Sequence, residues 1–214
     1  FNLDSVQYWF ERPIATQQTA WSFVAQMRGY ESAKAGGILW FGVDDAATSA
    51  LTPIYVNTTE VPWCLSEENG TMLKYSDTSL FWITNRVAQF AYLRYDIIGK
   101  KVRESVDAWE NNMLKDVEVI DNAIAAAPNA KKKAKIATKY TLNRAQQLFD
   151  KWVELDKYLM VKYIDGNVKG EDANGFIDNG NGKDIPGKIE QPGYSEKWKR
   201  AVAKDNGRIL EVVK

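Results

Sequence analysis

The most constraining feature of this sequence is a change in the spacing of its apolar residues near residue 78. Before that point apolar and polar or small residues alternate, as in TAWSFVAQMR at Thr19–Arg28, where Trp21, Phe23 and Met27 share one side. After it, apolar residues recur every three or four positions. A period of two predicts strands and a period near 3.6 predicts amphipathic helices. The chain is therefore expected to be α+β, with strands preceding helices.

Residues 13–77 are predicted to be mainly strands. The first is Thr19–Arg28, the second is Ile38–Val43, and the third is Thr52–Val56. The second is almost continuously apolar, which is typical of a strand in a sheet that is covered on both faces. Short links join the three, so an antiparallel meander is expected.

Residues 78–164 are predicted to form a long antiparallel helical hairpin. Asp77 or Thr78 is suited to cap the first helix, and Gly99 is the expected position of a bend. The dipeptide Pro128–Asn129 interrupts the helical spacing, which then resumes. Two helices joined by a short turn account for this pattern.

Residues 165–214 are predicted to be a loop-rich tail with a short helix and an extended end within Tyr194–Val213. The stretch DANGFIDNGNGKD, Asp172–Asp184, has the composition of a calcium site. Its acidic residues lack the alternate spacing and final Glu of a calcium loop, so polar turns are the expected structure.

Composition excludes several classes of function. Lys plus Arg and Asp plus Glu number 28 each, so no net field attracts nucleic acid or an anionic membrane, and neither is expected as a partner. Histidine is absent, and neither a metal nor a cofactor is expected. The basic cluster at Lys131–Lys133 and Lys135 is typical of a solvated helix start. No run reaches the roughly 18 apolar residues of a membrane span, and localisation stays open.

The best local candidate for a binding site is the link between the second and third strands. It carries Asp44, Asp45, Thr48 and Ser49 directly after a Trp-Phe-Gly strand. Carboxylates and hydroxyls at a strand end can bind the ammonium or amide groups of a ligand. The alternative is a plain turn in which Asp45 binds its own backbone.

Two further groups have a functional and a structural interpretation. Cys64 is the only cysteine, and without histidine to activate it we expect a buried, inert thiol rather than a nucleophile. Trp82, Phe90, Tyr92 and Tyr95 could line a ligand site on the first helix, but at helical spacing we expect them in the core.

Several segments together resemble the later part of the dipeptidase A family (PepD type), cysteine peptidases of the N-terminal-nucleophile hydrolase superfamily. They are TAWSFVAQMRGY, GGILWFGVDDAATSALTPIYV, TEVPWC, SLFWITNRVAQFAYLRYD and YLMVKYIDGNVK, within Pro13–Lys169. The resemblance implies an αββα sandwich of two stacked antiparallel sheets between helical layers. The helical pair would cover one sheet face, and the link Asp44–Ser49 would turn between strands.

The resemblance also implies where the chemistry lies. In that family an N-terminal Cys, freed from a leader, is the nucleophile and its own α-amino group is the base. Phe1 stands at the start of this chain, and Cys64 does not correspond to the nucleophile. Residues 1–214 are then expected to be the C-terminal portion of a dipeptidase, with no catalytic residue and inactive alone. Its expected partners are a dipeptide and the missing N-terminal catalytic portion.

The same resemblance implies that the strand link lines the substrate pocket, so its four polar residues are the expected substrate-binding residues. They are Asp44, Asp45, Thr48 and Ser49. Two alternatives stay open. One is a related N-acyl amidase, similar to bile-salt hydrolases or penicillin acylases. The other is a non-catalytic docking module whose helical pair forms a homo-oligomer interface.

Overall fold

The chain folds into two compact units, Phe1–Lys157 and Tyr158–Lys214, and each is described by itself. The computed structural model describes residues 2–9, 11, 13–29 and 35–206. Antiparallel strands come first and helices follow, so the predicted α+β class is confirmed. None of the helices in the described part is long and apolar enough to cross a membrane.

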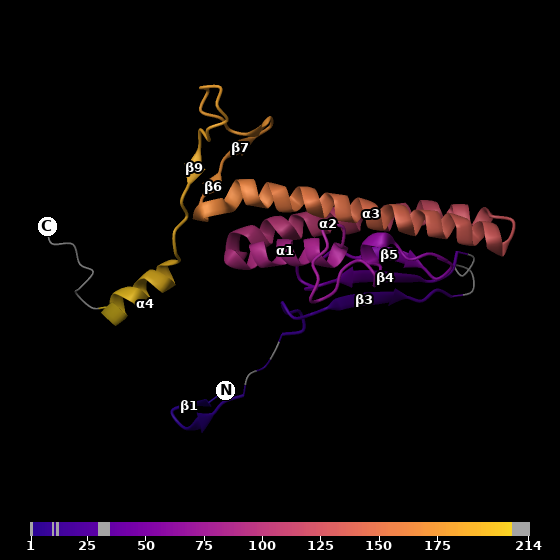
Figure 1. The fold of residues 1–214 in the computed structure, drawn as a ribbon, viewed down its shortest axis with the longest axis horizontal. Helices are drawn as coiled ribbons and strands as arrows, with labels where there is room; N and C mark the ends of the chain where they lie inside the picture. Colours follow the sequence, from indigo (N-terminus) through magenta and orange to yellow (C-terminus); the bar gives the residue numbers. More distant parts are fainter. Residues whose placement is uncertain (1, 10, 12, 30–34, 207–214) are drawn as a thin grey trace. The chain divides into compact units, whose positions relative to one another are not determined.

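The first unit is built on a three-stranded antiparallel meander. Its strands are β3 (Trp21–Gln26), β4 (Ile38–Val43) and β5 (Thr52–Tyr55), in the order β3-β4-β5 (Figure 1). Trp21 pairs with Val43 across the first ladder. The predicted strands and their meander are confirmed. A separate two-residue pair, β1 (Asn2–Leu3) and β2 (Val6–Gln7), precedes them.

The two faces of this sheet differ in burial. Trp40 and Tyr55 lie on the buried face. On the other face, Trp21 is 56% exposed and Phe23 is 52% exposed, and the Trp21 ring stacks on Phe23 and on Phe41. The expectation that the second strand is covered on both faces is therefore wrong. Alternate side chains of β4 are buried and half-buried, because strand neighbours point to opposite faces.

Three helices occupy the predicted hairpin region rather than two. They are α1 (Leu80–Leu93), α2 (Lys100–Ala126) and α3 (Ala130–Tyr163). A π-helical turn, Tyr95–Gly99, joins α1 to α2, so the predicted bend near Gly99 is a change of helix type. The Tyr95 ring passes within 3.0 Å of where a Cβ on Gly99 would stand, which explains the glycine.

The predicted cap of α1 is wrong. Ser79 is the N-cap residue, and its side chain makes no capping hydrogen bond. The Thr78 hydroxyl instead donates to Asn69 Oδ1 at 2.9 Å, while Asn69 Nδ2 donates to the Thr78 carbonyl at 3.0 Å. The hydrogen bond to Asn69 thus engages the Thr78 hydroxyl, which is no longer available to cap the helix. The two hydrogen bonds also connect the loop before α1 to the beginning of that helix.

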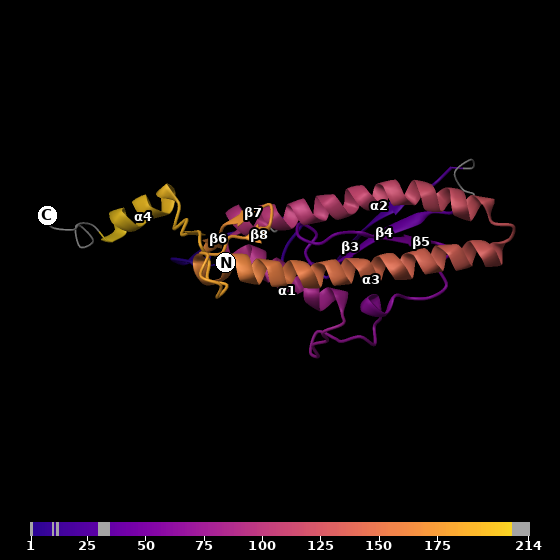
Figure 2. The same cartoon turned by 90° about the horizontal axis from the view of Figure 1, so that it is seen from above.

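The antiparallel pair α2 and α3 packs on the buried face of the sheet. Figure 2 shows the two helices side by side, with β4 and β5 seen between them. Tyr55 is central to this packing, because its hydroxyl donates to Asp121 Oδ1 at 2.6 Å and its ring meets the Tyr140 ring edge-on. Arg28 pairs with the same Asp121 carboxylate at 2.6 Å. The sheet and α2 are therefore joined by a polar contact inside an apolar core.

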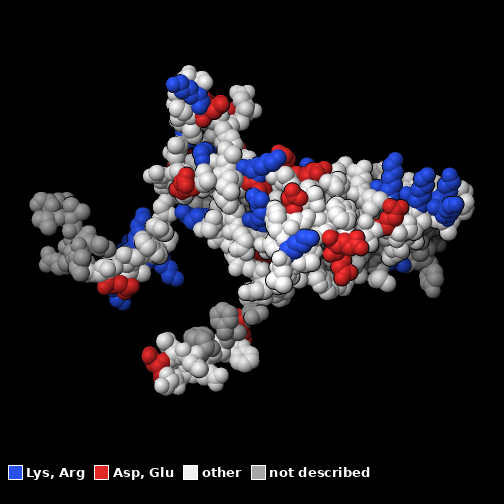
Figure 3. Space-filling model, in the orientation of Figure 1, with Lys and Arg blue, Asp and Glu red and all other residues white. Residues whose placement is uncertain are grey.

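The lysines at the beginning of α3 lie on the surface (Figure 3). Lys131, Lys132 and Lys135 are exposed. The Asn129 side chain accepts a hydrogen bond from the Lys132 backbone N–H at 3.0 Å and so caps the helix start. The predicted solvated helix start is confirmed.

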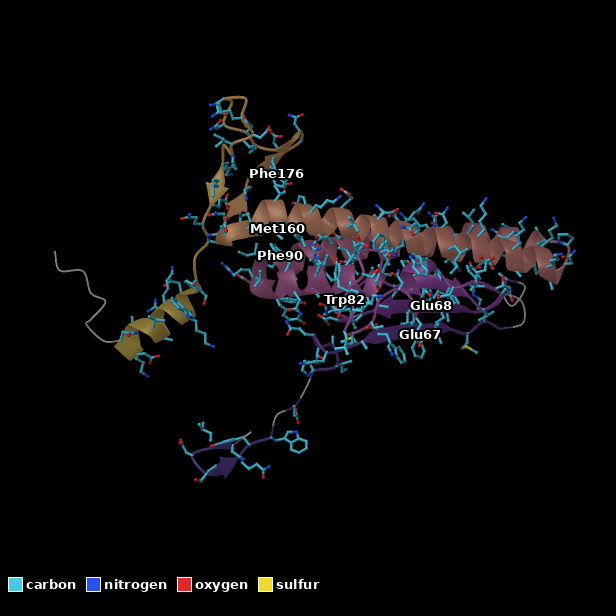
Figure 4. All side chains as sticks on the ribbon, viewed as in Figure 1. Glu67, Glu68, Trp82, Phe90, Met160 and Phe176 are labelled. Carbon is cyan, nitrogen blue, oxygen red and sulfur yellow. The ribbon has the colours of Figure 1, made fainter. Side chains whose placement is uncertain are left out.

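The second unit consists of the last turns of α3, short strand pairs and one helix. Strand β6 (Val168–Lys169) pairs with β9 (Ile189–Glu190), β7 (Glu171–Asp172) pairs with β8 (Gly175–Phe176), and α4 spans Glu196–Asn206. Phe176 stacks on Tyr158 at 5.8 Å between ring centroids (Figure 4). The predicted short helix is confirmed, while the extended end predicted after it lies outside the described residues.

The Asn- and Asp-rich segment of this unit is a series of side-chain turns. Asp172, Asp178, Asn179 and Asn181 each accept a hydrogen bond from the backbone N–H two residues later. This is the polar turn structure expected from the sequence. No group of three or more His, Cys, Asp or Glu side chains in the described ranges is placed to hold a metal ion.

We expect Tyr55→Phe to lower the free energy of unfolding by about 1–2 kcal/mol, because it removes a buried hydrogen bond to a charged acceptor. Tyr140→Phe is the matched control. Among the described residues the buried Tyr140 hydroxyl has no hydrogen-bond partner of ordinary geometry, so its loss should change stability by less than about 0.5 kcal/mol. Urea unfolding of both variants measures the difference, and equal effects would contradict this account of the core.

Candidate functional site

All four sequence-predicted site residues lie in one buried turn between β4 and β5. Asp44, Asp45, Thr48 and Ser49 are each at most 5% exposed. Asp44 adopts a left-handed backbone conformation, with φ at 68°, which turns the chain sharply out of β4. Asp tolerates this region better than most residues, which accounts for an acid at the position.

Asp45 organises the turn from within. Its Oδ1 accepts a hydrogen bond from the Ala47 backbone N–H at 3.0 Å, and its Oδ2 accepts one from the Thr48 hydroxyl at 3.3 Å. The Ser49 hydroxyl donates to the Asp45 carbonyl at 2.8 Å. The donors of Thr48 and Ser49 are therefore used within the turn, as the plain-turn alternative describes.

Helix α1 holds the acidic pair through two side chains, neither of which was predicted to contact the turn. Asn85 Nδ2 donates to Asp44 Oδ1 at 2.9 Å, and the Tyr92 hydroxyl donates to Asp45 Oδ2 at 2.8 Å. Burial and the contact with Asp45 raise the pKa of Tyr92 to about 12, so its hydroxyl keeps the proton that it donates. One sequence clue existed, because Asn85 and Tyr92 are spaced for a single helix face.

Tyr92 also corrects the interpretation of the helix aromatics as core residues. Tyr92 and Tyr95 are exposed, while Trp82 and Phe90 are half-buried. The Tyr92 ring lies on the surface and only its hydroxyl reaches inward to Asp45. Helical spacing alone did not reveal this, because an amphipathic ring can satisfy the same spacing at the edge of a core.

Helix α2 fixes the other end of the turn. Trp109 Nε1 donates to the Leu51 carbonyl at 3.0 Å, and the Leu51 backbone N–H donates to Glu110 Oε1 at 3.2 Å. With both ends held by helices, the turn is rigid, which is what a binding residue at its start requires.

Asp44 is the member of this turn with unused hydrogen-bonding capacity. Its side chain is 1% exposed, and among the described residues its Oδ2 has no hydrogen-bond partner. Burial raises the pKa of Asp44 above its ordinary value of 3.8. The hydrogen bond from Asn85 and a weaker one from the Asp45 backbone oppose this rise, and the Asp45 charge adds a little to it. A buried carboxylate with one free oxygen is costly, so it calls for an explanation.

A cavity of about 250 Å³ lies near this turn, although Asp44 is not among the residues of its wall. Ala20, whose carbonyl accepts the Asp44 backbone N–H at 2.8 Å, forms part of its wall, as does Val43. The remaining wall is largely apolar and includes Leu65, Phe81 and Trp82, the last labelled in Figure 4. The buried Asp44 carboxylate and this cavity are therefore two separate features of the region.

Cys64 also lines this cavity, but its thiol is not activated. It is 3% exposed, and burial raises its pKa to about 11. Thiolates, not thiols, are nucleophiles, so Cys64 is inert near neutral pH. The expected burial of the cysteine is confirmed, and the raised pKa agrees with an unreactive thiol.

A larger groove of about 1090 Å³ follows α3 at some distance from the turn in sequence, and it is a weaker candidate. Its charged walls include Lys131, Lys135, Glu60 and Asp150. None of its described wall residues carries a buried polar atom without a partner. The same holds for the walls of the smaller cavity, so the candidate site is placed at Asp44 by its own unpaired oxygen and not by either space.

Residues 3–108 match the family model of peptidase family C69. This range is just under half of the chain, and it contains the whole meander, the buried turn, Asn85 and Tyr92. Over this range the chain is similar to peptidase family C69, whose members hydrolyse peptide bonds, and the match supports a peptidase function. The comparison with curated proteins found no match.

We expect Asp44→Asn to stabilise the fold by about 1 kcal/mol at pH 7, because it replaces a buried charge that lacks one partner. The pKa of Asp44 is raised in the folded state, so its contribution to stability is present below pH 3.8 and is lost as pH rises through the folded pKa. The gain from the substitution should therefore shrink as pH falls toward 4.

Asp156→Asn is the control with the opposite sign. Asp156 pairs with Arg86 at 2.7 Å, so its loss should cost between zero and about 1 kcal/mol at pH 7. Thermal unfolding of both variants from pH 4 to 8 measures these differences. A destabilised Asp44→Asn at pH 7 would show that Asp44 has a stabilising partner and would refute the account above.

Proposed function

We propose that this chain is the C-terminal portion of a cysteine dipeptidase of the N-terminal-nucleophile type. In this proposal the nucleophile is an N-terminal Cys in a catalytic portion that precedes these residues, and the chain supplies walls of the substrate pocket. The match of residues 3–108 with a peptidase family supports the class of reaction. The resemblance of the strand and turn motifs to dipeptidase A supports the finer assignment.

The observation that carries the proposal is the uncovered apolar face of the sheet. Trp21 and Phe23 are more than half exposed, and they continue into Phe41 through ring stacking. Contiguous aromatic surface of this kind is typical of an interface. A second antiparallel sheet stacked about 10 Å away, as in an αββα sandwich, would bury it. The N-terminal catalytic portion is the partner that we propose for this face.

The chemistry of the described residues agrees with a nucleophile located elsewhere. Cys64 is a buried thiol whose pKa is raised to about 11, and the Ser49 hydroxyl donates to the Asp45 carbonyl. The α-amino group of an N-terminal Cys, with a reference pKa of about 8, can accept the thiol proton near neutral pH. Such an enzyme requires no histidine, and this sequence has none.

We expect the complete protein to release free amino acids from dipeptides and to lose this activity after treatment with a thiol alkylator. Residues 1–214 alone should be inactive. Cys64→Ala in the complete protein is the control, and it should keep both the activity and the sensitivity to the alkylator. Quantitation of released amino acids measures all five samples: the complete protein and Cys64→Ala, each with and without the alkylator, and the 214-residue chain.

Three results would contradict the proposal. They are activity that survives alkylation, activity that is lost in Cys64→Ala, and activity of the 214-residue chain by itself. Hydrolysis of N-acylated amino acids without hydrolysis of free dipeptides would replace the dipeptidase with the related amidase.

The interface has its own prediction. Phe23→Lys should destabilise the complete protein by about 2 kcal/mol more than it destabilises the 214-residue chain, since only a covered Phe23 loses its burial. Val119→Lys, on the exposed face of α2, is the matched control and should cost little in either form. Urea unfolding of both substitutions in both forms of the protein measures the loss of stability. Equal effects of Phe23→Lys in the two forms would exclude this face as the interface.

A further inference from the structure

The groove along α3, about 1090 Å³ in volume, has no part in the proposed peptidase function. Its α3 wall runs from Lys131 to Asp150, a length of about 28 Å at 1.5 Å per residue. The chain after β5 forms the other wall, where the Thr59 backbone N–H donates to the Thr138 hydroxyl at 3.0 Å (Figure 2). The family match covers residues 3–108, so it does not explain the α3 wall.

Three lysines follow one another along this groove at a regular spacing. Lys131, Lys135 and Lys139 line it, and all three are exposed. Each is four residues from the next, so they share one side of α3 and lie about 6 Å apart along its axis. None has an ion pair among the described residues, and residues 122–149 contain no acid to provide one on the same helix. The row therefore carries positive charge that the neighbouring helical turns do not neutralise.

The rest of the groove is apolar or carries side-chain amides. Ala134 and Leu142 are half-buried in its wall, while Asn143 and Gln147 are exposed along it. An amide side chain both donates and accepts hydrogen bonds, so it can bind the N–H and C=O groups of a peptide backbone. A mostly apolar concave surface with a few polar groups is typical of a ligand site.

The shape of the groove argues against a second copy of the same surface as its occupant. Two concave surfaces that face each other leave unfilled space, and the atoms around such space lose packing contacts. The occupant must therefore be a narrow, convex segment.

The residues of the wall also argue against a nucleic acid strand. Sites for single strands combine basic residues with aromatic rings on which the bases stack, and no aromatic residue lines this groove in the described part of the chain. Glu60 and Asp150 belong to the wall, and their carboxylates would repel phosphate groups. A peptide with acidic side chains opposite the lysines fits this combination better.

We propose that the groove binds an extended, acidic peptide segment of a partner protein, with acidic residues at alternate positions opposite Lys131, Lys135 and Lys139. Alternate side chains of an extended chain point to the same side and lie about 6.7 Å apart, close to the spacing of the lysines. Over the three positions the mismatch is about 1.4 Å, which the flexible stem of a lysine absorbs. About eight extended residues would span the whole groove.

The later residues of such a peptide would lie beside Asn143 and Gln147, whose amides bind its backbone. The acidic side chains give the interaction its register, because only alternate acids meet all three lysines. This inference goes beyond the proposed function and does not depend on it, since it concerns a different surface and is measured by binding alone.

The test measures binding of two fluorescent peptides of equal composition to the 214-residue chain by anisotropy. One is Glu-Ala-Glu-Ala-Glu-Ser-Asn-Ser, with alternate acids, and the other is Glu-Glu-Glu-Ala-Ala-Ser-Asn-Ser, with contiguous acids. The first should bind about fivefold more tightly, because contiguous acids in an extended chain place one of the three on the opposite side and lose one exposed ion pair. Salt at about 0.15 M screens charges that are not in contact.

Charge reversal at the middle lysine tests the register. Lys135→Glu should weaken binding of the alternating peptide at least about tenfold, since an attraction becomes a repulsion. A peptide with Lys in place of its middle Glu should bind this variant about as tightly as the original pair. Lys132→Glu is the matched control, because Lys132 is exposed on the same helix but does not line the groove, and it should change binding less than about twofold. Thermal unfolding verifies that both variants are folded.

The outcomes decide between this site and a general attraction of charges. Equal affinity for the two peptides, equal loss in Lys132→Glu, or no recovery with the charge-swapped peptide would each overturn the proposal. Displacement of the peptide by an equimolar amount of oligothymidine would reassign the groove to nucleic acid. Hydrolysis of dipeptides is measured separately, so failure here leaves the proposed function intact, and failure of that function leaves this site intact.

Discussion

The hydrogen bonds from α1 to the two adjacent acids are the constraint on which the rest of the site depends. Asn85 and Tyr92 each bind one carboxylate, so α1 and the β4–β5 turn cannot shift independently. The same helix contributes Phe81 and Trp82 to the cavity wall. A short polar network therefore fixes both the orientation of Asp44 and the shape of the space beside it. In the low dielectric of a core the satisfied hydrogen bonds of such a network, here those of Asp45, Asn85 and Tyr92, hold it rigid.

The two acids show how one turn can be stable and still keep a reactive group. Both carboxylate oxygens of Asp45 accept hydrogen bonds, from within the turn and from Tyr92, and these bonds stabilise the local fold. Asp44 keeps one oxygen free and accepts a raised pKa. A position that breaks the rule of polar satisfaction inside an otherwise consistent structure is where function is expected. The adjacent identical residues in the sequence thus have opposite roles.

The strands and helices were predictable because their signals are local. Period two defined β3, and the interruption at Pro128–Asn129 defined the α2–α3 turn. The exposure of Trp21 was not predictable, since alternation shows that a strand has an apolar face but not what covers it. The π-helical turn was seen only as a bend, because a helix of any type keeps similar apolar spacing.

The candidate site was predictable only in part, because the sequence pattern shows local features and not contacts between distant residues. Composition drew attention to Asp44 and Asp45, but the difference between them depends on Asn85 and Tyr92, which lie about forty residues further along the chain. Such pairings are set by how α1 crosses the turn, and no single-sequence pattern records them. Asn85 was visible as a polar residue at helical spacing, yet its partner was not.

The uncovered sheet face and the free carboxylate oxygen belong to one region of the sheet. Trp21 begins β3 and pairs with Val43, the residue before Asp44, while Ala20 accepts the Asp44 backbone hydrogen bond. A second sheet placed on Trp21 would therefore also approach the wall between Asp44 and the cavity. On the proposed function, one covering element would bury the apolar face and bring the catalytic portion toward this turn. The exposed aromatic surface that this structure carries would then be removed by that assembly step.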